Sequence, residues 1–88
     1  MKPFAIRTSI HTSLLDKTID MLIAALDRKF LIKAGIEVEM IHSEVTEIII
    51  RFVSTKRKSN EVYAYIERNW TFQSPLTLTN EMEEQHYG

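Results

Sequence analysis

The sequence predicts an α+β domain with two layers, in which a three-stranded sheet carries two helices on one face. Three observations lead to this fold class: an alternating strand comes first, a long amphipathic helix follows it, and two further alternating runs precede a shorter helix. The expected element order is therefore βαββα. We expect residues 1–75 to form this single domain and residues 76–88 to form a flexible acidic tail.

The first strand and the first helix are predicted by their periodicity. Apolar and polar residues alternate from Pro3 to His11, as in a strand with one buried face. Ser13 and Asp16 have the spacing of a helix-capping pair, and Gly35 can take the left-handed conformation that ends helices. Between these signals lies an apolar stripe that consists of Leu15, Ile19, Leu22, Leu26 and Phe30.

The second half of the chain predicts a hairpin and a shorter helix. The runs 36–40 and 48–52 alternate, and the polar residues 42–44 separate them. Three consecutive isoleucines in the second run put apolar side chains on both faces, so either this strand is central or its outer face meets a partner. Ser59 or Asn60 is expected to cap the helix that follows. Its apolar stripe consists of Val62, Tyr63, Ile66 and Trp70.

The composition fits one compact domain, because 88 residues with 44% hydrophobic content supply a single core. Cysteine is absent, so that core must hold without disulfides or thiolate-bound metal, and a reducing compartment is expected. We see no signal peptide, and no stretch approaches the roughly 20 apolar residues that span a bilayer. We therefore expect a cytoplasmic location and no membrane partner. The predicted core consists of Phe4, Ile6, Leu15, Ile19, Leu22, Leu26, Phe30, Val38, Ile50, Ile66 and Trp70.

Enzymatic chemistry is not predicted. The chain has two glycines, Gly35 and Gly88, which excludes the glycine-rich loops that cradle phosphates. Its three histidines lack the helical spacing of metal ligands, and no serine or threonine has a base and an orienting acid at a recognisable spacing. We therefore expect a non-enzymatic protein without a metal or other cofactor.

Two groups of side chains are candidates for contact with a partner. Tyr65 and Phe72 lie off the apolar stripe of the second helix and are able to anchor a protein partner. The basic cluster either pairs with nucleic-acid phosphates or with an acidic partner, or it is a charged loop before a helix that keeps an edge soluble, and we favour the last interpretation. This cluster consists of Arg51, Lys56, Arg57 and Lys58.

Two segments of the chain resemble the DinI-like family, small DNA-damage-inducible proteins of bacteria and phages that modulate the RecA filament. Residues 19–30 are similar to the first helix of that family, with Ile-Asp-x-Leu, a leucine four residues later, paired cations and an apolar residue. Residues 66–70 are similar to the apolar-x-x-x-Trp ending of its second helix. The resemblance covers about residues 3–72. It implies the βαββα fold and a regulatory role in the SOS response.

The resemblance also implies a set of contact residues. In DinI-like proteins, negative charge on and after the second helix is thought to imitate the DNA backbone toward RecA. These proteins also usually have a polar hairpin that contains Gly or Asn. In this chain Trp70 is followed by Thr71 and Phe72 instead of acids, and the hairpin at residues 42–47 contains neither Gly nor Asn. The glutamates that remain to play this part are Glu61, Glu67, Glu81, Glu83 and Glu84.

Three classes of function therefore remain. The leading hypothesis is a regulator that binds a RecA-type filament through its glutamates. The second is a nucleic-acid-binding module that uses the basic cluster. The third is a homodimeric structural protein whose surplus apolar positions meet across an interface. These positions are Met21, Leu31, Ile32 and Ile49.

Overall fold

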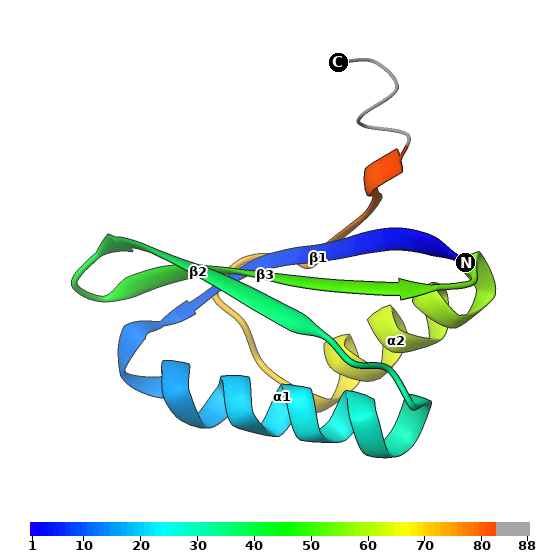
Figure 1. Cartoon of the computed structure of the whole chain (residues 1–88). Coiled ribbons are helices and arrows are strands. Elements are labelled where there is room, and N and C mark those ends of the chain that lie inside the picture. The colour runs from blue at the N-terminus through cyan, green and yellow to red at the C-terminus, as the bar shows by residue number, and fades with distance from the viewer. Residues whose placement is uncertain (83–88) are drawn as a thin grey trace.

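A sheet layer lies over a helix layer in the computed structural model, which describes residues 1–82 (Figure 1). The sheet has four antiparallel strands in the order β2-β3-β1-β4, and both helices cover the same face. The α+β class is confirmed, but the three-strand prediction is wrong, because a fourth strand follows α2. The elements are β1 (Lys2–His11), the 3₁₀ turn η1 (Thr12–Leu14), α1 (Leu15–Phe30), β2 (Gly35–His42), β3 (Val45–Ser54), α2 (Lys56–Asn69) and β4 (Thr77–Asn80).

β3 is an interior strand, as its isoleucine run indicates, because it pairs with β2 on one side and β1 on the other. Ile50 lies opposite Ile6 of β1 and opposite Ile36 of β2. Directly opposed residues of antiparallel strands point to the same face. These isoleucines therefore form one row across the sheet on the face that the helices cover, with Ile6 and Ile50 fully buried.

β4 is built from residues that the sequence assigns to a tail. The chain returns to β1 because Gln73 N donates to Ser9 O at 2.9 Å and Ser9 N donates to Ser74 Oγ at 2.9 Å. β4 then pairs with β1, and Leu78 lies opposite Ile6. The four residues of β4 include one apolar side chain, so they carry no visible strand periodicity. The predicted boundary at residue 75 is thus wrong for residues 77–80.

The ends of α1 differ from the predicted ones. The helix follows η1, where His11 Nδ1 accepts from Ser13 N at 3.2 Å, so Ser13 does not act as the predicted cap. It ends before Leu31, and Ile32 N donates to Leu26 O at 3.2 Å. Ile32 is buried in the core, 5% exposed, and the helix must stop early to place it there.

α2 begins earlier than predicted. Thr55 Oγ1 accepts from Lys58 N at 3.1 Å and caps the helix. Ser59, one of the two expected caps, is fully buried inside the helix and donates to Lys56 O at 2.6 Å. The residues 56–58 are therefore the first turn of α2 and not a loop.

The core lies between the sheet and the two helices. Val38, predicted to be in it, is 50% exposed, because β2 is an edge strand that extends beyond the helix layer. Leu15, Phe30 and Trp70 pack on the core while partly exposed. The buried cluster consists of Phe4, Ile6, Ile10, Leu22, Leu26, Ile32, Ile48, Ile50, Phe52, Val62 and Ile66.

Candidate functional site

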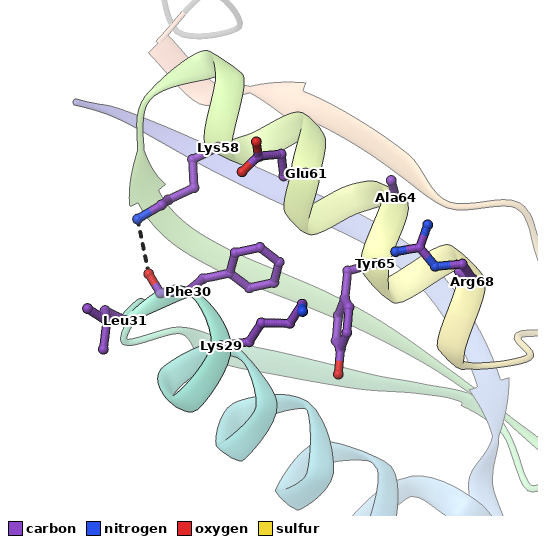
Figure 2. Close-up of a pocket in the computed structure, with 8 residues that line it drawn as sticks. All are labelled: Lys29, Phe30, Leu31, Lys58, Glu61, Ala64, Tyr65 and Arg68. Atoms are coloured by element: carbon purple, nitrogen blue, oxygen red, sulfur yellow. Dashed lines mark hydrogen bonds between the residues drawn. The ribbon is translucent and has the colours of Figure 1, made fainter.

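Seven of the predicted contact residues lie on three surfaces. One is a groove between α1 and α2 (Figure 2), the second lies at the C-terminal end of α2, and the third is the sheet face that points away from the helices. Lys56 and Arg57 are exposed in the first turn of α2, and Glu83 and Glu84 lie outside the described residues. The groove contains Lys58, Glu61 and Tyr65, the second surface Glu67 and Phe72, and the third Arg51 and Glu81.

The groove has a volume of about 540 Å³ and opens to solvent. The last turn of α1 and one face of α2 form it, because residues three or four positions apart on a helix point the same way. Three cations and one anion line it, which gives the lining a net charge of three minus one, or +2. The lining residues are Lys29, Phe30, Leu31, Lys58, Glu61, Ala64, Tyr65 and Arg68.

Lys58 connects the two helices at one end of the groove. Its Nζ donates to Phe30 O at 3.1 Å (Figure 2). The last carbonyls of a helix lack intrahelical partners and carry partial negative charge, so an ammonium group there stabilises α1. An ammonium has three donors, and this bond uses one of them. Lys58 therefore has a structural contact and still contributes positive charge to the groove.

Tyr65 is packed on several sides within the groove. Its ring meets Phe30 edge-on at a centroid distance of 5.6 Å and Trp70 at 5.9 Å. Lys29 Nζ lies 5.2 Å from its centroid, within cation–π range. The prediction that Tyr65 lies off the packing stripe is wrong, because the ring joins the two helices.

Leu31 has an unusual backbone at the rim of the groove. Its φ and ψ are 57° and 35°, and within residues 1–82 it is the one residue other than glycine with positive φ. Glycine usually occupies this position after a helix, since a side chain strains the left-handed conformation. The leucine side chain is also 84% exposed. A strained and exposed apolar side chain thus stands beside three cations.

On the second surface, Glu67 contacts another residue of this chain, Tyr63. The Tyr63 hydroxyl lies 3.2 Å from Glu67 Oε2 and 3.2 Å from Leu76 O. Burial raises the pKa of Tyr63, and the hydrogen bond to Glu67 and its negative charge raise it further. Phe72 is partly buried and packs against the core. This surface therefore connects α2 to the start of β4.

The third surface pairs two residues that the sequence assigns to rival functions. Arg51 Nη1 donates to Glu81 Oε2, and its Nε lies 3.3 Å from Glu37 Oε1 at ion-pair distance but without hydrogen-bond alignment. The hydrogen bond to Glu81, together with the charges of Glu81 and Glu37, raises the pKa of Arg51. The Glu81 side chain is only 15% exposed. Arg51 and Glu81, which are predicted as contacts for different partners, are therefore paired with each other.

Four groove residues were not singled out as a site from the sequence: Lys29, Phe30, Ala64 and Arg68. The spacing of residues 58, 61, 65 and 68 is a sequence signal for one face of a helix. That Lys29 faces the same groove depends on how the two helices pack. No local pattern in the sequence contains this information.

Residues 1–82 contain no group of three or more histidine, aspartate or glutamate side chains placed to hold a metal ion. Within the same residues, no helix combines the length and the apolar character needed to cross a membrane.

No protein-family model and no curated protein matches the chain.

Proposed function

We propose that this protein is a non-enzymatic regulator that binds another protein, and that a RecA-type filament of the DNA-damage response is its partner. The observation that carries the proposal is the position of the two DinI-like segments, which lie on α1 and α2 and form one layer. Leu22 and Leu26 of the first segment and Ile66 of the second are fully buried. These residues support the architecture of such a protein, and the exposed residues of the same helices supply the contact.

α2 supplies the proposed contact through its exposed face. Glu61 and Glu67 are exposed on this helix, but Glu61 faces the groove and Glu67 lies beside Tyr63. The contact is therefore distributed along α2 and does not form one acidic ridge. Among the cations of the rival nucleic-acid hypothesis, Arg51 and Lys58 have contacts within the chain. That leaves Lys56 and Arg57 as exposed cations of this cluster.

Charge reversal on α2 tests the proposal. The double variant Glu61→Lys with Glu67→Lys should weaken co-sedimentation with RecA filaments on single-stranded DNA by about fivefold or more, because exposed charges contribute up to about 1 kcal/mol each. The matched control is Glu39→Lys with Glu44→Lys, which changes the net charge equally at exposed positions of β2 and the hairpin. This control should change binding by less than about twofold.

Salt dependence adds a second readout. Binding by exposed glutamates should weaken as salt rises, since charges are screened beyond a Debye length of roughly 8 Å at physiological salt. A wild-type protein that does not co-sediment with the filament contradicts the proposal. Equal loss in the hairpin control also contradicts it. Binding of single-stranded DNA without RecA that is lost on Lys56→Glu with Arg57→Glu would establish the rival function instead.

A further inference from the structure

We propose that the groove between α1 and α2 binds an acidic segment of a partner protein, in which carboxylates flank an apolar side chain. This site goes beyond the proposed filament contact, because it recognises negative charge on the partner, whereas that contact uses the glutamates of this chain. It does not depend on the identity of the partner.

Uncompensated positive charge is the first observation. In the part of the chain that the structure describes, no carboxylate lies within ion-pair distance of Lys29 or Arg68. Both side chains line the groove from opposite helices (Figure 2). Cations that line a concave surface raise the local potential more than cations on a flat one. The guanidinium of Arg68 also presents paired donors that match a carboxylate.

The apolar rim is the second observation. Leu31 projects at the end of α1 with 84% of its surface exposed. Ala64 is exposed on α2, and its single methyl group leaves the groove open. Residues held in strained backbone conformations are concentrated at sites that bind ligands. An apolar side chain of the segment can cover Leu31 while its carboxylates meet the cations.

Ring packing and hydrogen bonding favour a protein segment over a nucleic acid. Single-stranded nucleic acids bind where bases stack on free aromatic faces along a positive channel. Here Lys29 lies over the face of Tyr65, and Phe30 and Trp70 meet that ring edge-on. Glu61 also places a carboxylate in the groove, and it can accept a peptide N–H, a donor that the sugar-phosphate backbone of a nucleic acid does not have.

The test is fluorescence anisotropy with a labelled twelve-residue peptide that alternates Glu or Asp with Leu. Lys29→Gln with Arg68→Gln should weaken its binding by about fivefold or more. The matched control, Arg28→Gln with Arg57→Gln, removes the same charge from exposed positions that do not line the groove. It should change affinity by less than about twofold. Leu31→Gly should weaken binding while the protein remains folded.

Several outcomes decide the matter. Amide-resonance shifts on peptide addition that concentrate at residues 29–31 and 61–68 support the site, and circular dichroism confirms that each variant is folded. Equal binding of a peptide with Gln and Asn in place of the acids overturns the proposal. Tighter binding of a twelve-nucleotide thymidine strand also overturns it, as does wild-type affinity in the groove variant. A sedimentation mass of two chains that returns to one chain in the groove variant shows that a second copy occupies the groove, and this rejects the proposal too.

Discussion

At the scale of single residues, the structure pairs side chains that look independent in the sequence. Arg51 and Glu81 are assigned to rival binding functions by their charge, yet the structure joins them to each other. Glu67 is likewise a contact of Tyr63. A sequence pattern shows that a residue is charged or exposed, but it does not show whether a distant residue already neutralises it. The candidate contacts could therefore be named from the sequence, but their availability could not.

The contribution of Tyr63 to the stability of the folded protein should depend on pH. The Tyr63 hydroxyl lies within hydrogen-bond distance of Glu67 on the same helix and of Leu76 O, just before β4. Because the pKa of Tyr63 is raised in the folded protein, the unfolded chain loses this proton first as pH rises. The stabilisation is thus fully present below the ordinary tyrosine pKa of about 10 and is lost as pH rises through the folded pKa.

Tyr63→Phe tests this dependence. The variant should be less stable than wild type by about 1 kcal/mol near neutral pH, because it lacks the hydroxyl hydrogen bonds. The difference in stability between the wild type and the variant should become smaller above about pH 10, since only the wild type loses stability by ionisation at this site. Urea unfolding at pH 8 and above pH 10 measures both values. A difference that stays constant or widens at high pH contradicts the assignment.

At the scale of elements, the sequence predicts helix faces well and helix ends poorly. The stripes place Leu22, Leu26 and Ile66 in the core, where the structure has them. The ends depend on contacts that are distant in sequence: the burial of Ile32 stops α1, and the burial of Ser59 extends α2 back to its cap. Periodicity reports the side of a helix that packs, whereas its last turn depends on what the rest of the fold must bury.

Leu31→Gly tests the C-terminal end of α1. The left-handed conformation costs a residue with a side chain about 1 to 2 kcal/mol, and glycine loses about 0.5 to 1 kcal/mol more backbone entropy on folding. The side chain is mostly exposed, so little burial is lost. The variant should therefore be more stable by about 0.5 to 1 kcal/mol in urea unfolding.

Gly35→Ala is a useful comparison for that variant. Gly35 has no positive φ, and an added Cβ meets nothing within 4 Å. Alanine should be tolerated there. It should raise the free energy of unfolding by about 0.4 to 1 kcal/mol, because it lowers the conformational entropy of the unfolded chain. If Leu31→Gly is instead destabilising while Gly35→Ala is not, then the leucine side chain packs in solution and the strain argument is wrong.

At the scale of the whole molecule, the strand count shows what a local pattern misses. β1 and β3 are predicted by alternation, but β4 is identified only by its place beside β1. Polar contacts bring it there, including Thr8 Oγ1 to Ser74 O at 2.8 Å. Thr8 is 66 residues distant from Ser74 in the sequence. Hydrogen bonds across such a separation have no periodic signature, so the segment resembles a solvated tail until the fold is known.

Truncation tests whether residues 76–82 stabilise the fold as a fourth strand or behave as a tail. The test compares a chain that ends at Pro75 with a reference chain that ends at Met82. Loss of the segment that contains β4 should lower the free energy of unfolding by about 2 kcal/mol or more, because Leu76 and Leu78 are partly buried and a fully buried leucine contributes about 1.5 to 3 kcal/mol. Trp70 and Leu76 line the same pocket, so the fluorescence of Trp70 should also shift toward that of an exposed indole in the shorter chain. Urea unfolding followed by fluorescence and by circular dichroism measures the loss, and coincident curves in the reference indicate one cooperative domain. Equal stability of the two chains within about 0.5 kcal/mol would show that residues 76–82 do behave as a tail.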